Sequence, residues 1–470
     1  MTDLLIRGGT VITMDEARRV IADGAVAITA GRIEAVGPAA EVPQQAAEII
    51  DARGHAVLPG LIDGHAHAGH GLVKTLAGGD SNAWMAACQH IYTLASPPSF
   101  WRAEARLAAL ERLMFGVTTG VSLLGGGDSV MRTDDPAGGT GHCEGVLEIG
   151  IRDIMAIGPT RPPHPRTYTR PNGSEHPISF EQQLETCGRL IEDWHGRDGR
   201  IFVATLMPVY REAEHDPANV ALIERQGRAI RELGQRHGTL FHQDGHRSGS
   251  LDMAGRMFGL LGPDAFMSHC TDLTDADIDA LAVTGTTVVH NPSAIASVRG
   301  YCPVSRLLDR GVGVFLGSDG TAPDRSTDMF RHMFQCMRLH QREARDERLM
   351  PPGKLLEMVT IDAARALGMS DRIGSLEPGK LADVITVDLR KPHLYPPNMP
   401  VWRVVCFANG QDVDTVVVGG RVLMRGRQVP HVDMADVLDS AAAETDAMLD
   451  RSGLRPLLAE PASIWGAARH

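Results

Sequence analysis

Two histidines stand close together at the end of an apolar run. The run Val57 to Ile62 is followed by Asp63-Gly64 and then by His65-Ala66-His67. In a strand, side chains at i and i+2 point to the same face, so this spacing aims two imidazoles at one point. Paired neutral imidazoles suit a transition-metal ion, most often zinc. A His-x-His motif fits two ordinary polar residues equally well, so the rest of the chain must decide.

Polar side chains of similar chemistry end several later runs of strand length. The expected strands after the first are 118–123, 153–157, 201–209, 239–244, 265–270, 286–291 and 312–319. Helical patterns separate most of them; residues 102–115, for example, place Leu107, Leu110 and Met114 on one face. Alternating strands and helices over roughly 260 residues predict a parallel (β/α)8 barrel of the TIM type.

The carboxyl ends of the strands of such a barrel share one rim. We therefore expect His65 and His67 to meet the residues that end later strands, which are His242, His269, His290 and Asp319. A single histidine at a strand end is more often a polar residue without a ligand role. Several of them on one rim with a carboxylate favour a site. The loop after His67 is expected to carry His70 away from it.

The two ends of the chain have β character. Residues 1–56 contain short apolar runs cut by glycines, and residues 373–430 return to the same pattern. We expect these segments to form one composite β-sandwich domain, with the barrel at 57–372 and a helical tail at 431–470. Residues 125–150 and 158–180 lack periodicity and are expected to be long loops at the mouth of the barrel.

Composition limits the classes of partner. The 470 residues carry a formal net charge of −12, which opposes a nucleic-acid or anionic-membrane surface. No stretch approaches the ~20 apolar residues of a membrane span, and no secretory signal is evident. The seven cysteines include no Cys-x-x-Cys pair, which is typical of buried thiols in a reducing compartment. These features predict a cytoplasmic protein that acts on a small molecule.

The chain resembles the amidohydrolase superfamily, in particular its cytosine deaminase-like and triazine hydrolase (chlorohydrolase) branch. The matching stretches extend from the β-type segments at the N-terminus to those near the C-terminus. They are Leu58-Pro-Gly-Leu-Ile-Asp-Gly-His-Ala-His67, Met267-Ser-His269, Val288-Val-His-Asn-Pro-Ser293, Gly317-Ser-Asp319-Gly320 and Ile373-Gly-Ser-Leu-Glu-Pro-Gly-Lys-Leu-Ala-Asp383.

The resemblance implies one divalent ion with His65, His67, His242 and Asp319 as ligands. Zinc is favoured, with Fe²⁺, Mn²⁺ and Co²⁺ as alternatives. Relatives with two metals commonly bridge them with a carboxylated lysine on the fourth strand, and the fourth expected strand, 201–209, holds no lysine. We therefore expect a mononuclear site. Homo-oligomers are also common among such relatives.

The expected catalytic residues are His269 and Asp319. A divalent ion lowers the pKa of its bound water and so supplies hydroxide near neutral pH. Asp319 can take the proton of that water and pass it to the leaving group. His269 can hold the water or stabilise the charge that develops on the attacked group. The attacked centre would be an electrophilic carbon that bears nitrogen, as in an aminated heterocycle.

The sequence departs from the deaminating relatives near His242. They usually place a glutamate three residues after that histidine to protonate a ring nitrogen, and this chain has Gly245 there. Asp244 or His246 could substitute, and His290 could contact the substrate or be structural. The asparagine common after Pro292-Ser293 is also missing. Amide, urea or carbamate hydrolysis without ring deamination therefore stays an alternative, as does a non-catalytic scaffold, which would require the loss of ligands.

Overall fold

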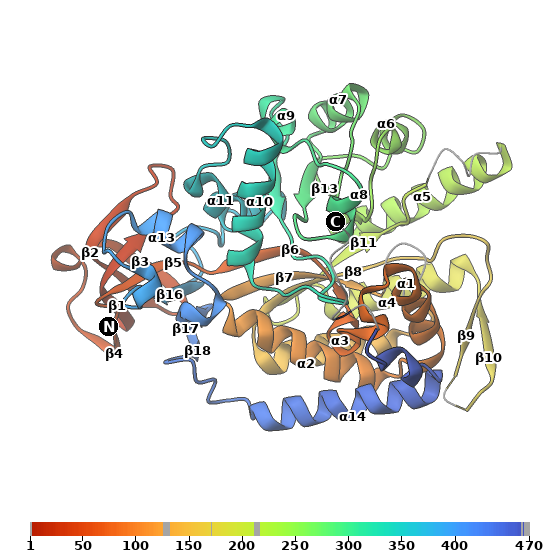
Figure 1. Ribbon diagram of the computed structural model, residues 1–470, viewed down its shortest axis with the longest axis horizontal. Helices are drawn as coiled ribbons and strands as arrows, with labels where there is room; N and C mark the ends of the chain where they lie inside the picture. Colours follow the sequence, from red (N-terminus) through yellow and green to blue (C-terminus); the bar gives the residue numbers. More distant parts are fainter. Residues whose placement is uncertain (1, 126–131, 171, 211–216, 462–463, 465–470) are drawn as a thin grey trace.

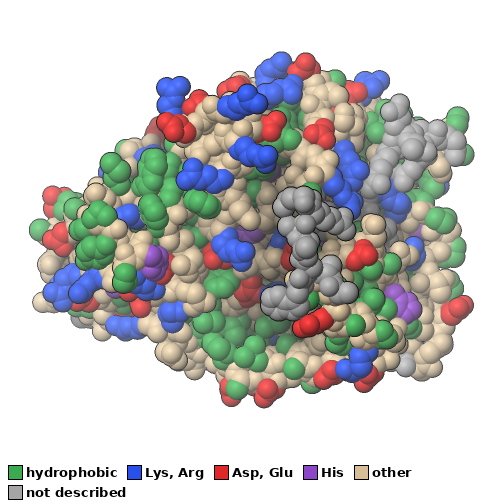
Figure 2. All heavy atoms as spheres, viewed as in Figure 1, with side chains coloured by type: hydrophobic (Ala, Val, Ile, Leu, Met, Phe, Trp, Pro, Cys, Tyr) green, Lys and Arg blue, Asp and Glu red, His purple; other side chains and the backbone are tan. Residues whose placement is uncertain are grey.

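The computed structural model describes residues 2–125, 132–170, 172–210, 217–461 and 464. Figure 1 shows a barrel ringed by helices, with a second sheet at the side of the molecule that holds the N-terminus. On the face in Figure 2, basic and acidic side chains are intermixed. Among the described helices, none combines the length and apolar character that crossing a bilayer demands.

Eight parallel strands form the barrel in the order β15-β14-β13-β12-β11-β8-β7-β6. They are β6 (Leu61–Ala68), β7 (Val117–Leu124), β8 (Arg152–Ile157), β11 (Ile201–Leu206), β12 (Leu240–Gln243), β13 (Ala265–Ser268), β14 (Thr287–His290) and β15 (Val314–Leu316). Each lies within or beside a strand expected from the sequence, so the predicted (β/α)8 barrel is confirmed. The backbone N–H of Asp319 donates to the carbonyl of His65 at 2.8 Å and helps to close the ring beside the expected site.

Helices cover the outside of the barrel. They are α1 (Ser81–His90), α2 (Pro98–Met114), α3 (Pro136–Ile149), α4 (Phe180–Trp194), α5 (Pro217–His237), α6 (Ser250–Arg256), α7 (Asp275–Thr284), α8 (Ile295–Arg299), α9 (Val304–Asp309), α10 (Met329–Ala344), α11 (Pro352–Met358) and α12 (Ile361–Ala366). A capping box begins α7, because the side chains of Thr274 and Asp277 each accept from the other's backbone N–H.

Strands from both ends of the chain hydrogen-bond into a second, mixed sheet. It contains β1 (Thr2–Ile12), β2 (Val20–Thr29), β3 (Arg32–Pro38), β4 (Ala46–Asp51), β5 (His55–Pro59), β16 (Val384–Asp388), β17 (Val413–Val418) and β18 (Arg421–Met424). The apolar run expected as one strand is divided at Gly60 between β5 of this sheet and β6 of the barrel. Gly60 packs so closely on Thr118 that a Cβ there would lie 2.2 Å from its hydroxyl oxygen. The division of the chain into domains stays a prediction.

The prediction of long loops at 125–150 and 158–180 is wrong over much of both segments. The first contains α3, and the second contains the hairpin β9 (Arg166–Thr169) and β10 (Glu175–Ile178). Glycines hid α3 from periodicity, yet they let it approach α2 closely. A Cβ at Gly141 would meet the carbonyl oxygen of Pro98 at 2.6 Å, and one at Gly145 would meet that of Arg102 at 2.7 Å. Close packing therefore outweighs the low helix propensity of glycine.

The last part of the described chain returns to the barrel. The helix α13 (Pro400–Cys406) lies between β16 and β17, and α14 (Met434–Ser452) follows β18. Asp433 caps α14 by accepting from the N–H groups of Ala435 and Asp436. Figure 1 shows α14 lying along α2 on the outside of the barrel.

A buried arginine ties α2 to the barrel strands beneath the expected site. The Arg112 guanidinium donates to Asp63 at 3.0 and 3.1 Å, to Asp153 at 3.3 Å and to the Ser122 hydroxyl at 2.8 Å. Asp63 also accepts from the backbone N–H and hydroxyl of Ser318 at 2.8 Å each. One guanidinium thus links α2 to β6, β7 and β8, and through Asp63 to the residue before Asp319.

We expect Arg112→Met to lower the free energy of unfolding by about 3–5 kcal/mol, because it leaves the carboxylates of Asp63 and Asp153 buried without their cation. The matched control is Arg102→Met on the same helix, since Arg102 pairs with Glu148 at the surface. That change should alter the unfolding free energy by less than about 1 kcal/mol. Urea unfolding followed by circular dichroism measures both; equal effects would contradict the assignment of Arg112 as a central tie.

Candidate metal centre

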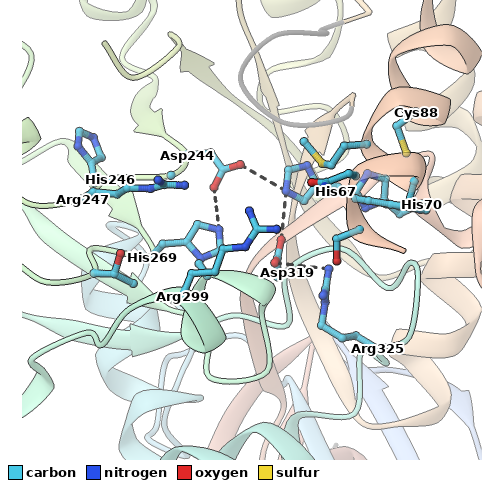
Figure 3. A pocket seen from close by; sticks show the side chains of 17 residues that line it. His67, His70, Cys88, Asp244, His246, Arg247, His269, Arg299, Asp319 and Arg325 are labelled. Atoms are coloured by element: carbon cyan, nitrogen blue, oxygen red, sulfur yellow. Dashed lines mark ion pairs between the residues drawn. The ribbon is translucent and has the colours of Figure 1, made fainter. Parts of the chain in front are cut away.

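Four barrel strands bring the expected ligands to one rim. His65 and His67 lie on β6 and His242 on β12, while His269 and Asp319 directly follow β13 and β15. All these side chains are buried or nearly so, and Figure 3 shows several of them around a common space. The structure thus brings together all five residues that the sequence placed at the centre.

The donor atoms stand at ligand-like separations. His65 Nδ1 lies 3.0 Å from His242 Nε2, and His65 Nε2 lies 3.7 Å from Asp319 Oδ1. His67 Nε2 lies 3.2 Å from the same Asp319 oxygen. Ligands at ~2.1 Å from a tetrahedral ion stand about 3.4 Å from each other. The spacing of His65 Nε2, His67 Nε2 and Asp319 Oδ1 therefore suits ligands of one ion, whereas His242 Nε2 faces the other nitrogen of the His65 ring.

Backbone carbonyls orient two of the imidazoles. His242 Nδ1 lies 2.8 Å from the Phe266 carbonyl oxygen, and His67 Nδ1 lies 3.1 Å from that of Gly125. A carbonyl only accepts, so each Nδ1 carries the proton and each Nε2 presents a lone pair toward the cluster. His65 Nε2 is buried and has no hydrogen-bond partner among the described residues. The lone pair of His65 Nε2 has no donor and fits a metal ion, and the carbonyls act as the outer partners that orient metal-binding histidines.

Asp244 is a second carboxylate in the centre. Its oxygens lie 3.4 Å from Nε2 of His65, 3.4 Å from Nε2 of His67 and 3.2 Å from Nε2 of His269. From the sequence alone, Asp244 is a candidate only as a substitute for the missing glutamate. The signal for its position was available, because His242 and Asp244 have the same i, i+2 spacing as His65 and His67.

His70 also lies at the centre, and the expectation that its loop carries it away is wrong. Its ring stacks on that of His67 with centroids 4.7 Å apart, and both of its ring nitrogens are buried without a partner among the described residues. Gly320 makes room for it, since a Cβ at this position would lie 2.0 Å from His70 Nδ1. A turn of 3-10 helix at His70–Val73 bends the chain back after β6.

The two other histidines proposed as substrate contacts differ in position. His246 borders the same cavity as Asp244, and its Nδ1 lies 2.9 Å from the Ser250 hydroxyl. His290 does not border that cavity as the described residues define it. Its Nε2 instead lies 3.2 Å from Nε2 of His340, whose Nδ1 lies 2.7 Å from the Tyr301 hydroxyl.

The cavity above the cluster has a volume of about 200 Å³. Trp84, Met85 and Cys88 of α1 form an apolar wall, and Arg247 and Arg299 stand at the other side. The floor carries His67, His269, Asp244 and Asp319. This space can hold a small planar molecule with one end at the cluster.

The charges of the centre attract a cation. Burial alone would raise the pKa of Asp319, but Arg325 and the surrounding histidines lower it well below its usual range. Burial, together with His65, lowers the pKa of His242. In His67, burial would also lower the pKa, but the Asp319 and Asp244 carboxylates raise it above the usual value. Metal ligation requires ionised carboxylates and neutral imidazoles, so a bound cation would replace the proton that the two carboxylates favour on His67.

The backbone at the centre is held in an uncommon conformation. His269 has φ 64° and Asp319 has φ 62°, in the left-handed region that non-glycine residues seldom adopt. Strain of this kind concentrates where a side chain must be aimed at a particular point. Here it directs two of the expected functional groups toward the cavity.

Comparison with known proteins agrees with this geometry. Residues 224–423 match the model of the amidohydrolase family. The chain is 33% identical over 459 residues to a 5-methylthioadenosine/S-adenosylhomocysteine deaminase of Syntrophobacter fumaroxidans, covering 93% of this chain and 96% of the relative. It is 30% identical to a 5'-deoxyadenosine deaminase of Methanosarcina mazei, covering 96% and 99% of the two chains.

A solved structure is similar over almost the whole chain. The adenosine deaminase of Xanthomonas campestris, crystallised with bound zinc, superposes with a TM-score of 0.80 at 25% identity and covers 96% of this chain and 99% of its own. Fold, rim residues and relatives agree. The chain belongs to the amidohydrolase family and is a metal-binding hydrolase that acts on carbon–nitrogen bonds, other than peptide bonds, of small molecules.

Proposed function

We propose that the protein removes an exocyclic amino group from a nitrogen heterocycle by hydrolysis, with purine nucleosides as the leading substrate class. One observation carries the proposal. The Nε2 atoms of His65 and His67 lie 3.7 and 3.2 Å from the same Asp319 oxygen, and His67 and Asp319 border a cavity of about 200 Å³. The names of the relatives, all deaminases of adenine-containing compounds, support the same reaction.

The ion is proposed to be a single Zn²⁺ held by His65, His67, His242 and Asp319. The donor set of imidazole nitrogens and carboxylate oxygens supports zinc, and so does the zinc in the structural relative. When bound, such an ion supplies an acidified water as the nucleophile. Asp244 and His269 would complete the surroundings of that water.

The chain's own groups then move the protons. Asp319 takes a proton from the attacking water at its carboxylate, whose other oxygen faces Arg325 at 3.6 Å. The ring nitrogen gains the electron pair as the ring carbon becomes tetrahedral, and Asp244 passes to it a proton from His269, which lies 3.2 Å away; Gly245 cannot fill this role. The hydroxyl group on the tetrahedral carbon returns a proton to His269 as it becomes the carbonyl of the product. Ammonia leaves after it receives the proton first taken by Asp319.

A second candidate is hydrolysis of an amide, urea or carbamate. Gly245 favours it, because position 245 carries no acid that could protonate a ring. The space beside Gly245 is open, since a Cβ there would meet nothing within 4 Å. Homo-oligomeric assembly and a cytoplasmic location stay predictions beside either reaction.

The reaction class is tested by product analysis. Incubation with a panel of aminopurines, aminopyrimidines and aminotriazines should release ammonia, whereas release of amines from amides, ureas or carbamates would favour the second candidate. Chelation should abolish the activity, and added Zn²⁺ should restore it. Elemental analysis of the restored protein should find one equivalent of zinc per chain. Full activity in metal-free protein would overturn the proposal.

We expect Asp319→Asn to reduce kcat by roughly 100-fold or more, because the amide cannot accept the proton of the water. Asparagine is chosen since it tolerates the positive φ of this position. Steady-state kinetics with circular dichroism of the folded variant measure the effect. An asparagine variant that turns over at the normal rate would remove Asp319 from the mechanism.

We expect Asp244→Asn to lower kcat by at least about 10-fold at saturating zinc, because the amide cannot deliver a carboxylic proton. Asp252→Asn provides the matched control, since Asp252 lies on α6 outside the cavity that holds the cluster and pairs with Arg256. Its kcat should stay within twofold of the unmodified enzyme. Equal kcat for the two variants would leave Asp244 without a chemical role.

A further inference from the structure

Two arginines at the mouth of the metal cavity have no anionic partner in the described part of the chain. Arg247 and Arg299 are exposed and border the cavity, and no described carboxylate lies within ion-pair distance of either guanidinium. Other arginines nearby are engaged. Arg325 donates to the carbonyls of Gly320 and Ala322 at 2.7 and 2.8 Å, and Arg256 pairs with Asp252 at 2.6 Å. The two free guanidiniums are therefore available to a ligand.

Arg247 and Arg299 follow two barrel strands and lie on either side of Thr271. Arg247 follows β12 and forms a β-bridge with Thr271, which follows β13. Arg299 ends α8 beyond β14, and its neighbour Gly300 packs on Thr271 so closely that a Cβ there would lie 2.8 Å from Thr271 Cβ. Thr271 also borders the cavity. We call Arg247, Thr271 and Arg299 the arginine rim.

The arginine rim faces the reacting end of the cavity. In Figure 3 the side chains of Arg247 and Arg299 extend toward the space bordered by Asp244, His269 and Asp319. The cavity on this side continues past Gly245 and Arg247, which also border an adjoining groove lined by Ser248, Asp252 and Met257. A molecule with its reacting carbon at the cluster can thus place a substituent against the rim.

The net charge of the chain bears on which ligand the arginine rim can bind. The chain carries a formal net charge of −12, so an anionic molecule is repelled unless local cations receive it. Guanidinium groups bind carboxylate and phosphate through paired, charge-assisted hydrogen bonds, and the Thr271 hydroxyl can donate one more. Two arginines at the cavity entrance without an anionic partner among the described residues indicate a ligand that carries negative charge.

We propose that the substrate carries an anionic group, a carboxylate or a phosphate, which Arg247 and Arg299 bind at the arginine rim while the amino-bearing ring lies at the cluster. This inference rests on the proposed deamination and specifies its substrate class. It places the charge of the substrate at the end remote from the reacting carbon.

Matched substrates test the inference. 5'-Carboxymethylthioadenosine differs from 5'-methylthioadenosine by a carboxylate, and adenosine 5'-monophosphate differs from adenosine by a phosphate. We expect kcat/KM for at least one anionic member to exceed that of its neutral partner by roughly tenfold or more. The pair that shows the preference identifies the anion. Neutral members turned over as well as both anionic ones would overturn the inference and leave the deaminase proposal intact.

Variants assign the preference to the rim. Arg247→Gln and Arg299→Gln should each reduce the ratio of anionic to neutral kcat/KM severalfold. Arg228→Gln, which changes an exposed arginine of α5 that is paired with Glu224 and borders neither the cavity nor the groove, should leave the ratio unchanged. A ratio that falls equally in all three variants would indicate general electrostatics and would overturn the assignment to the rim.

Binding of the deaminated compounds separates the inference from the chemistry. Isothermal titration of the zinc-loaded protein with inosine 5'-monophosphate and with inosine, and with the two thioether inosine analogues, measures the same ratio without turnover. Absence of ammonia from every substrate would refute the proposed function, while tighter binding of the anionic compound, lost in Arg299→Gln, would still support the rim. Equal dissociation constants within both pairs would refute the rim.

Discussion

The hydrogen bond from the Asp319 N–H to the His65 carbonyl is the constraint on which the site depends. It joins the first and last strands of the barrel and brings the only predicted carboxylate ligand to within reach of two histidines more than 250 residues earlier. The same junction rests on Asp63, which receives both the N–H and the hydroxyl of Ser318 and is itself held by Arg112. Barrel closure and the geometry of the centre therefore depend on the same contacts.

Charge balance is the second organising feature. Two carboxylates, Asp244 and Asp319, lie buried among four histidines, and an uncompensated buried charge is strongly unfavourable. Carbonyl acceptors leave His67 and His242 with inward lone pairs, so these rings cannot neutralise both carboxylates without taking up protons. A bound cation satisfies carboxylates and lone pairs together. The acidic floor and the basic rim are then complementary halves of one cavity.

Much of this arrangement could be predicted from the sequence because it follows from backbone periodicity. Strands with apolar runs and polar ends gave the barrel, and parallel strand direction placed His65, His67, His242, His269 and Asp319 on one rim. Tertiary packing decided the features that were missed. The glycines of α3 look like a loop until α2 is beside them, and the position of His70 depends on the space at Gly320.

Asp244 was harder to identify for a different reason. The family motif places a glutamate at position 245, whereas in this chain the acid is Asp244, two residues after His242 and on the same strand face. For His290, a tertiary contact decides where the ring lies. Its place at a strand end was correct, but a partner on α10, His340, draws its ring into a separate hydrogen-bonded pair, and no strand pattern contains that information.

The contact between His70 and Gly320 has a consequence for how this enzyme can change over generations. Any side chain at position 320 would overlap the imidazole at position 70, whereas a smaller residue at position 70 would leave room for one. Substitutions at these two sites are therefore not independent, and the permissible order is fixed: position 70 must shrink before position 320 can grow. Such epistasis would preserve the pair as an inherited unit beside the proposed ligand His67, even though the two residues lie far apart along the chain.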